Sequence, residues 1–290
     1  MRCGYWLPYC PTDQLTGRET ASPRGRIFLM RAAARGMTDI TPGWASAMDF
    51  CLGCRACEAV CPAGVPYGRL FEEAKAAIVR HLGRPWWQRV LYRLILDGLI
   101  PRPARLRAAG WLLWLAQRSG LVALAGWLLR RLPRLPEHWR HKADLLPPVP
   151  RPGGPRQALY PAAAPYRYRV AVLTGCVMDV FFPHVNDATI RVLQRNGCDV
   201  LVPPGQVCCG ALHAHTGFPE RARELARRNI DRFPRDVHAI IVNSAGCGAF
   251  LKEYGELLGD DPRYAAAARD FSERVRDVTE FLSMIPLEPP

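Results

Sequence analysis

Acidic residues are scarce in this sequence relative to basic ones, with 26 Asp and Glu against 39 Lys and Arg in 290 residues. It also lacks any run of 18 or more apolar residues free of charge, and residues 1–4 lack the apolar core of a signal peptide. We therefore expect a cytoplasmic address. No flavin or nicotinamide motif, no paired carboxylates and no Ser/His/Asp arrangement stands out, which disfavours substrate chemistry on this chain.

Cysteine, in contrast, is abundant, with 11 residues. Reducing compartments keep thiols free, so a disulfide framework is a poor explanation for so many of them. Metal binding or redox chemistry is the better interpretation, and the spacing of the cysteines should distinguish the two.

Residues 1–80 hold six of the cysteines in a stretch that we expect to be loop-rich with short helices. Four of them form a complete C-x2-C-x2-C-x3-C-P run, at Cys51, Cys54, Cys57 and Cys61. In this pattern three thiolates hold one iron–sulfur cube, and the fourth ligates the other cluster of a pair. Zinc sites more often use two separated C-x2-C pairs, so the spacing favours iron–sulfur over zinc.

A second run is only partly present, between Cys3 and Cys10. Trp6 occupies its third position, and its first position would fall immediately before Met1. Trp6 cannot replace a thiolate, because the indole nitrogen is a donor only.

The crossover of the fourth cysteine defines two ligand sets. The first is a full set for one 4Fe-4S cluster: Cys10, Cys51, Cys54 and Cys57. The second set has only two thiolates: Cys3 and Cys61. Two thiolates do not normally hold a cubane, so we expect this second site to be empty, to carry a smaller cluster, or to use an outside ligand such as an upstream cysteine.

The positive charge is concentrated between Arg80 and Lys142, where 13 Lys and Arg face only two acidic residues. The same segment contains six of the eight Trp residues. Within it, residues 106–129 form an apolar run interrupted by Arg118, which a spanning helix would place near the bilayer centre at a cost of roughly 2.5 kcal/mol or more. We predict one or two helices broken near Gly120, either docked as a hairpin on the protein or a partner, or lying in a membrane interface. Basic charge alone supports only non-specific nucleic-acid binding, and we expect none.

Residues 145–165 are too rich in Pro and Gly for regular structure and are interpreted as a linker. Beyond it, short apolar runs alternate with helical patterns. We predict strands at 170–173, 199–202 and 239–242, and helices at about 185–194, 219–233 and 249–258. On the helix at 219–233 the apolar face is assigned to residues 222, 225, 226, 230 and 233. This order indicates a parallel sheet with right-handed crossovers.

The remaining cysteines follow these strands. Cys176 follows the first strand, Cys208 and Cys209 follow the second, and Cys247 follows the third. Loops after the carboxyl ends of parallel strands line one crevice, so we expect the four thiols to converge on one site. Metal ligation is favoured over vicinal thiol chemistry at Cys208 and Cys209, because adjacent cysteines form strained disulfides.

The predicted architecture is mixed. It comprises an N-terminal α-helical ferredoxin-like iron–sulfur domain at 1–80, a basic helical segment at 81–144, a linker at 145–165 and an α/β parallel-sheet domain at 166–290.

Several other residues belong to no clear functional motif. Cys198 is expected to be a packed hydrophobe. His213 and His215 are interpreted as polar loop residues, with cluster or proton-path contact as the alternative. Arg24 and Arg26 could support a cluster or a partner carboxylate, or lie in a solvated turn. The Gly246–Gly248 turn lacks the full glycine pattern of a nucleotide site.

These motifs resemble the iron–sulfur subunit of bacterial glycolate oxidase and its relatives in lactate utilisation and anaerobic glycerol-3-phosphate oxidation. The resemblance covers nearly the whole chain, with matching stretches at 3–27, 51–68, 173–183, 196–200, 208–217 and 243–255. The resemblance implies a cysteine-rich CCG domain after residue 166, with a further iron–sulfur cluster on Cys176, Cys208, Cys209 and Cys247. Phe250 stands where the family pattern has a last cysteine, and the second CCG half of the family pattern is not found, so we expect a separate chain to supply it.

The resemblance further implies a non-catalytic electron-transfer subunit of a glycolate dehydrogenase-like complex. It would pass electrons from FAD-containing dehydrogenase subunits that oxidise a 2-hydroxy acid toward a membrane quinone, with peripheral contact to the cytoplasmic face of the inner membrane. The alternative is a heterodisulfide reductase-like module that acts on a thiol or disulfide substrate at the CCG cluster. A zinc-stabilised scaffold would be colourless.

Overall fold

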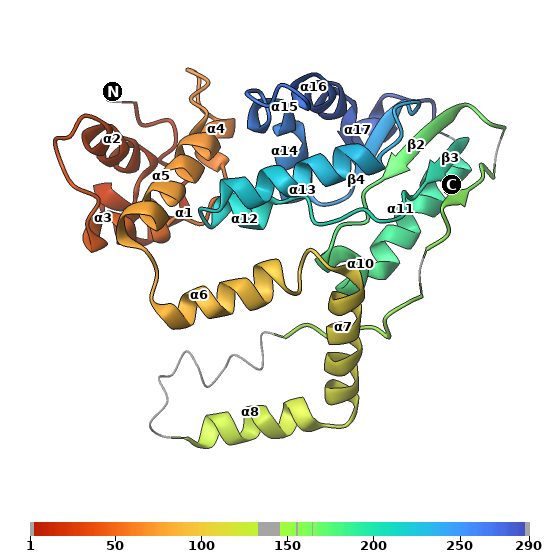
Figure 1. Ribbon diagram of the computed structural model, residues 1–290, viewed down its shortest axis with the longest axis horizontal. Helices are drawn as coiled ribbons and strands as arrows, with labels where there is room; N and C mark the ends of the chain where they lie inside the picture. The colour runs from red at the N-terminus through yellow and green to blue at the C-terminus, as the bar shows by residue number, and fades with distance from the viewer. Residues whose placement is uncertain (1–2, 133–145, 155, 164, 288–290) are drawn as a thin grey trace. The chain divides into compact units, whose positions relative to one another are not determined.

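The computed structural model describes residues 3–132, 146–154, 156–163 and 165–287. The chain forms two compact units (Figure 1), of which unit 1 comprises residues 1–92 and 210–223 and unit 2 comprises residues 93–209 and 224–290. Residues 133–144 of the predicted basic segment, including Trp139 and Lys142, and residues 145, 155 and 164 of the predicted linker lie outside the described residues. The domain boundaries expected at 80, 144 and 165 stay predictions.

Unit 1 is helical. Its elements are α1 (Pro11–Thr16), η1 (Glu19–Ala21), α2 (Pro23–Ala34), α3 (Pro42–Asp49), α4 (Ala56–Ala59), α5 (Tyr67–Leu82), α6 (Trp86–Tyr92) and α12 (Ala211–His215). The expectation of a loop-rich region is wrong, since α2 and α5 run for 12 and 16 residues.

Local sequence explains where these helices begin and how they pack. Ser22 accepts a hydrogen bond from the Gly25 N–H at 2.9 Å, and Pro23 occupies the first helical position of α2. The core of the unit joins α3 to α5 through Trp44, Met48 and Ile78. Helix α1 begins directly after Cys10, and α3 and α5 flank the run from Cys51 to Cys61.

Unit 2 is built on a sheet. Its elements are η2 (Arg93–Asp97, a π-helical turn), α7 (Pro103–Arg118), α8 (Leu121–Arg131), β1 (Leu159–Tyr160), β2 (Tyr168–Val172), α10 (Val177–Phe181), α11 (Pro183–Arg195), β3 (Cys198–Leu201), α13 (Pro219–Arg232, which begins in unit 1), β4 (Ala239–Val242), α14 (Ala245–Lys252), α15 (Tyr254–Leu257), α16 (Ala265–Arg274), β5 (Val275–Asp277) and α17 (Val278–Ser283).

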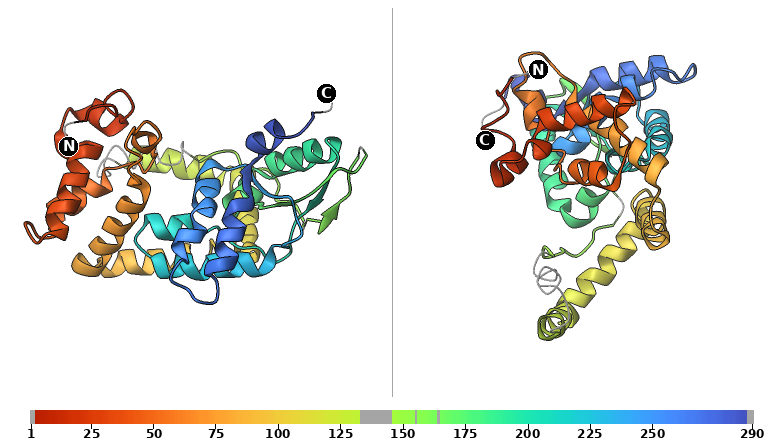
Figure 2. Two further views of the ribbon diagram at one scale, coloured as in Figure 1. Left: turned by 90° about the horizontal axis from the view of Figure 1, so that it is seen from above. Right: turned by 90° about the vertical axis from the view of Figure 1, so that its left-hand side faces the viewer.

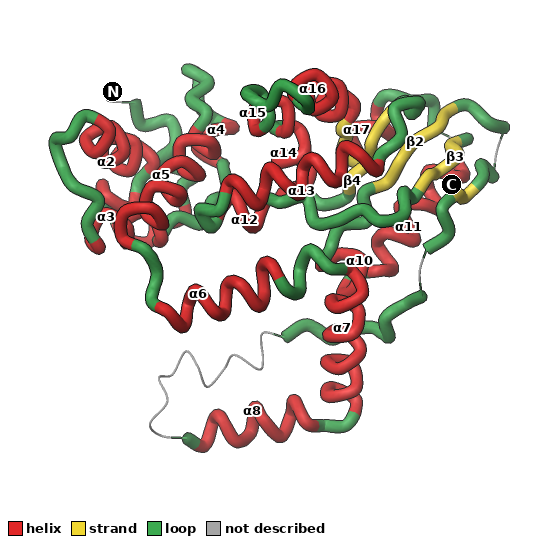
Figure 3. The backbone as a smooth tube through the Cα atoms, in the orientation of Figure 1, coloured by secondary structure: helices red, strands yellow, loops and turns green. Residues whose placement is uncertain are grey.

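The sheet has the strand order β1-β3-β2-β4-β5 and is parallel except for β1 (Figure 3). The three predicted strands are therefore confirmed. Helices cover both faces (Figure 2). On one face α11 and α17 place Leu193 and Phe281 against Val170 and Ile241. On the other face α14 packs so closely that a Cβ at Gly248 would lie 2.9 Å from a Val242 methyl.

Three expectations for this unit are corrected. The predicted linker contains regular structure, because Leu159 and Tyr160 pair antiparallel with the free edge of β3. The last strand, β5, was not predicted, since it has only three residues. The helix expected at 249–258 is two helices, and α14 begins early enough to place Cys247 in its first turn.

The predicted helix break at Gly120 is confirmed, with Gly120 at φ +79° between α7 and α8. No single helix in the described part of the chain has the length and apolar composition to cross a membrane, although α7 and α8, bent by 73°, meet those criteria as a pair. Helix α7 packs on α10 at Gly110, where a Cβ would lie 2.5 Å from a Val180 methyl. Docking of this segment on the protein is thus observed for α7, but the expected hairpin is wrong, because two helices bent by 73° do not run antiparallel.

Candidate functional site

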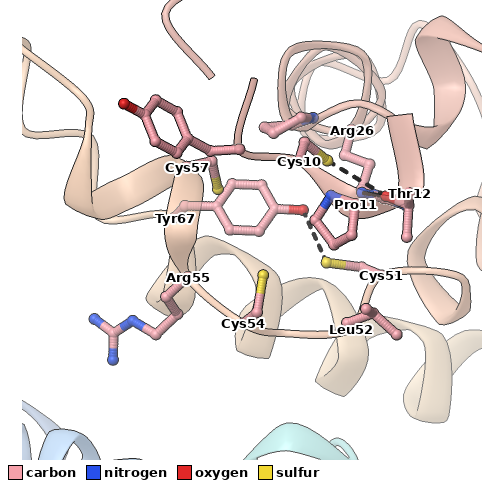
Figure 4. Close-up of a pocket in the computed structure, with 12 residues that line it drawn as sticks. Cys10, Pro11, Thr12, Arg26, Cys51, Leu52, Cys54, Arg55, Cys57 and Tyr67 are labelled. Atoms are coloured by element: carbon pink, nitrogen blue, oxygen red, sulfur yellow. Dashed lines mark hydrogen bonds between the residues drawn. The ribbon is translucent and has the colours of Figure 1, made fainter. Parts of the chain in front are cut away.

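Four cysteines predicted to share one cluster line one pocket of unit 1 (Figure 4). Cys10 precedes α1, and the other three lie on the loop and short helix between α3 and α5: Cys51, Cys54 and Cys57. Tyr67, at the start of α5, projects between them, with its hydroxyl 3.5 Å from the Cys51 Sγ.

The loop between Cys51 and Cys57 has a constrained backbone. Gly53 and Arg55 both adopt left-handed conformations, at φ +65° and +57°, and Arg55 is the one non-glycine residue with positive φ among those described. For a non-glycine residue such as Arg55 this conformation costs energy, and such residues tend to occur at functional sites. They curl the loop so that the Gly53 N–H donates to the Cys51 Sγ at 3.4 Å. Hydrogen bonds of this kind stabilise cluster-ligating sulfurs.

The titration of these groups reflects their proximity. Burial, followed by the neighbouring thiols of Cys51, Cys10 and Cys54, raises the pKa of Cys57 to about 12. Burial and the Cys51 sulfur also raise the pKa of the Tyr67 hydroxyl. A buried thiol beside three others needs a positive charge nearby to become a thiolate, which an iron core supplies.

The remaining two ferredoxin-type cysteines line a neighbouring cavity of about 220 Å³ in unit 1. Cys3 and Cys61 face it together with Cys57, Trp6 and Val65. Trp6 is buried, and its indole nitrogen donates to the Cys3 carbonyl at 3.1 Å. The structure therefore brings together the two cysteines predicted for the second site, and the place of the third is filled by packing.

The four cysteines of unit 2 also converge. Strand β2 leads through α10 and α11 to β3 on one side, whereas β4 leads to β5 on the other, so Cys176 and Cys247 follow two adjacent strands at the point where the connections diverge. Open α/β sheets bind ligands at such switch points. The thiols form a hydrogen-bonded chain in the order Cys176, Cys208, Cys209 and Cys247.

Mutual contact and burial dominate the titration of this set. The hydrogen bond with Cys208 and then burial raise the pKa of Cys176, and contacts with Cys208 and Cys247 followed by burial raise that of Cys209. Cys208 and Cys209 are both buried, while Cys247 lies in the first turn of α14. The arrangement is a closed four-thiol site with one ligand beside a helix N-terminus, where negative charge is favoured.

Two residues that sequence reasoning missed support the cysteine pair. Asn229 on α13 is fully buried, and it accepts from the Val207 N–H at 2.9 Å and donates to the Cys208 carbonyl at 3.2 Å. The Tyr254 hydroxyl donates to the Cys209 carbonyl at 2.6 Å. Ile230, assigned to the apolar face of α13, is partly buried, and the adjacent Asn229 is the fully buried residue; a polar residue at helical spacing from Leu225 is the signal that the sequence offers.

Other candidate residues are placed as follows. Cys198 is fully buried in β3, as expected for a packed hydrophobe. The expectation that His213 and His215 are loop residues is wrong, since both lie on α12. His213 is buried, and His215 pairs with Glu72 at 2.8 Å within unit 1. Phe250 is buried with its ring against Tyr254.

The arginines of the 22–27 stretch lie on helix α2, not in a solvated turn. Arg24 is half-exposed and pairs with Glu19 at 2.7 Å. Arg26 is buried and faces the pocket of Cys10 and Cys51.

The donor sets fit iron–sulfur clusters. Each main site offers four thiols and no carboxylate, the soft ligand chemistry that such clusters use. In the described part of the chain, no three His, Cys, Asp or Glu side chains surround a position suited to a single metal ion.

Three known families match separate parts of the chain. The 4Fe-4S dicluster domain family matches residues 1–65, the linker region of the glycolate oxidase iron-sulfur subunit matches 87–146, and the cysteine-rich domain family matches 170–252. The chain is therefore an iron–sulfur protein of the ferredoxin-type and CCG-domain class.

The chain is also similar to individual proteins of known name. It is 45% identical over 289 residues to the probable glycolate oxidase iron-sulfur subunit of Bacillus subtilis, covering 97% of this chain and 64% of that protein. It is 36% identical over 296 residues to the glycolate oxidase iron-sulfur subunit of Escherichia coli, covering 99% and 66%. Lactate utilization protein A of Shouchella clausii is 34% identical over 39% of this chain and 47% of its own length.

This chain belongs to the family of glycolate oxidase iron–sulfur subunits. It spans slightly less than two thirds of the length of the two relatives that it matches throughout. No solved structure matches it.

Proposed function

We propose that this chain is an electron-transfer subunit that carries electrons from a flavin dehydrogenase subunit, which oxidises a 2-hydroxy acid such as glycolate, toward a membrane quinone. The observation that carries the proposal is the pair of four-thiol sites on one chain whose residues 87–146 match the linker of glycolate oxidase iron-sulfur subunits. Bound clusters supply the one-electron chemistry, and the chain itself acts as a carrier without a catalytic residue.

The proposed ligand sets follow the two pockets and the unit 2 switch point. One cluster is held by Cys10, Cys51, Cys54 and Cys57, and the CCG-domain cluster is held by Cys176, Cys208, Cys209 and Cys247. Cys3 and Cys61 serve a second ferredoxin-type cluster that requires further ligands. In each case the protein's contribution is to hold the thiolates in place.

A second candidate function has one specific observation in its favour. Cys208 and Cys209 are adjacent and hydrogen-bonded through their thiols, which suits a heterodisulfide reductase-like module that acts on a thiol or disulfide substrate at the CCG cluster. Reduction of a heterodisulfide by the anaerobically reduced protein alone would favour this candidate. Electron uptake only from a flavin subunit favours the first.

The cluster assignment is tested by anaerobic purification, measurement of iron, sulfide and zinc per chain, and electron paramagnetic resonance of the reduced protein. Near four irons indicates the ferredoxin-type site alone, and near eight indicates two centres. Cys54→Ser should remove most of the ferredoxin-type signal and leave the CCG-domain signal, whereas Cys209→Ser should do the reverse. Loss of both signals in either variant would refute the two-site assignment, and zinc without sulfide would refute the electron-transfer proposal.

Membrane contact through α7 and α8 is part of this proposal. We define the elbow surface as the exposed large apolar residues of these helices: Trp111, Leu112, Leu115, Leu121, Leu124, Trp127 and Leu128. No acidic residue occurs between positions 98 and 131, and Arg side chains stack on the neighbouring indoles, with Arg131 3.8 Å from the Trp127 ring centroid. Exposed Leu and Trp flanked by Arg are typical of helices that lie in an anionic lipid interface.

Vesicle flotation tests this contact. The chain should float with vesicles containing phosphatidylglycerol and much less with pure phosphatidylcholine, and a triple Leu→Ser change at positions 121, 124 and 128 should abolish flotation. Leu15→Ser on α1, which is more exposed, is the matched control. Unchanged flotation of the triple variant would assign the elbow surface to a partner subunit or a separate CCG-half chain.

A further inference from the structure

Arg26 is a buried cation without an acidic partner. Its side chain is 1% exposed, and an arginine keeps its charge in any protein environment. Its hydrogen bonds go to the Ala47 carbonyl at 2.9 Å and, from both terminal nitrogens, to the Thr12 hydroxyl at 3.2 Å. None of the carboxylates that the structure describes pairs with it.

A buried charge in this setting is unfavourable unless an opposite charge lies nearby. Arg55, the other arginine at the same pocket, shows the usual solution, because it pairs with Glu58 at 2.7 Å. Arg26 has only neutral oxygens. The residues that line the pocket include no Asp or Glu, so the compensating charge must come from what the pocket binds.

The contacts of Arg26 lead to a cluster sulfur. Thr12 accepts from Arg26 and lies 3.4 Å from the Cys10 Sγ, and it also donates to the Ala21 carbonyl at 2.7 Å. Arg26 itself lines the pocket beside Cys10, Cys51 and Tyr67 (Figure 4). The guanidinium is thus held rigidly against the four-thiol site by α1 and α2.

We propose that Arg26 is the counter-charge of the cluster at Cys10, Cys51, Cys54 and Cys57, and that it sets the reduction potential of that cluster. The inference rests on the ligand set proposed above. Four thiolates outweigh the positive charge of a 4Fe-4S core, so the bound cluster is an anion, and one-electron reduction makes it more negative. A fixed cation therefore stabilises the reduced form more than the oxidised form.

The test is a redox titration of the anaerobically purified chain, followed by electron paramagnetic resonance of the ferredoxin-type signal. Arg26→Gln should lower the equilibrium constant for one-electron reduction by about tenfold, which corresponds to about 59 mV toward more negative potential. Arg26→Lys keeps the charge and should stay near the unmodified chain. Arg35→Gln, at the C-terminal end of the same helix and exposed, is the control and should leave the potential unchanged.

Iron content separates this inference from the cluster assignment. If Arg26→Gln binds the same iron and its potential matches the Arg35→Gln control, the counter-charge role is refuted while the cluster assignment stands. If Arg26→Gln loses iron and Arg26→Lys retains it, the charge itself is required and the inference is supported. Equal loss of iron in both variants would show that Arg26 acts through its hydrogen-bond geometry and would overturn the inference. Absence of iron in the unmodified chain would instead refute the proposed function.

Discussion

Replacing Asn229 by leucine removes the buried amide that supports the Cys208–Cys209 pair while keeping a side chain of similar shape. The change leaves the Val207 N–H and the Cys208 carbonyl without their bonds of 2.9 and 3.2 Å in a fully buried position. Each unsatisfied buried group costs about 1–3 kcal/mol. We therefore expect a loss of about 2–5 kcal/mol, a large fraction of the roughly 5–15 kcal/mol that stabilises a typical domain.

The assay is anaerobic urea unfolding followed by circular dichroism and by the visible absorption of the clusters. Arg228→Ala, on the exposed face of the same helix, is the control and should change stability by no more than about 0.5 kcal/mol. Because Asn229 also lies 3.4 Å from the Tyr254 hydroxyl, the double change with Tyr254→Phe should be non-additive by about 0.5 kcal/mol or more.

The same variant should release iron from the CCG site to a chelator faster than the unmodified chain, with the ferredoxin-type iron unaffected. An Asn229→Leu unfolding midpoint within error of Arg228→Ala would refute the reasoning, because two unsatisfied buried groups cannot be energetically silent.

Three further outcomes are expected. Gly217→Ala should destabilise unit 1 by more than Gly36→Ala: both glycines have positive φ, but a Cβ at Gly217 would lie 2.5 Å from the Lys75 carbonyl oxygen whereas Gly36 has open space, so equal thermal shifts would exclude the close approach. Glu280→Gln should lower the free energy of unfolding of unit 2 at pH 7 by less than about 1 kcal/mol, seen as a lower melting temperature, because the Lys252–Glu280 pair is partly exposed. The Lys252 hydrogen bond lowers the pKa of Glu280 from 4.5, so this stabilisation is present above pH 4.5 and is lost as the pH falls through the lowered pKa; a difference that persists at pH 2 would contradict it. Gly110→Leu should expose α7 to limited proteolysis, since the side chain would meet Val180, while Gly120→Ala at the bend should not; equal cleavage of both would refute the packing.

Several features of the fold were accessible from local pattern. The apolar run of β4 is bounded in the structure at the residues predicted, and the α7–α8 break falls at Gly120 because few residues other than glycine adopt that conformation readily. Short elements were not accessible. β1 and β5 have two and three residues, and each is stabilised by the neighbouring strand and carries no periodicity of its own.

The sequence by itself determined the chemistry of the protein, because the spacing of thiols along a short loop restricts which cofactor they can hold. It also predicted that Cys176, Cys208, Cys209 and Cys247 converge, since the carboxyl ends of parallel strands meet at one edge. Only the tertiary structure decided which polar side chains surround these sulfurs. Asn229 and Tyr254 lie far along the chain from the cysteines whose carbonyls they bond, and Arg26 reaches the Cys10 pocket through Thr12. The roles of all three depend on burial, which removes water and leaves each charge and hydrogen bond to be satisfied by the protein or its cluster.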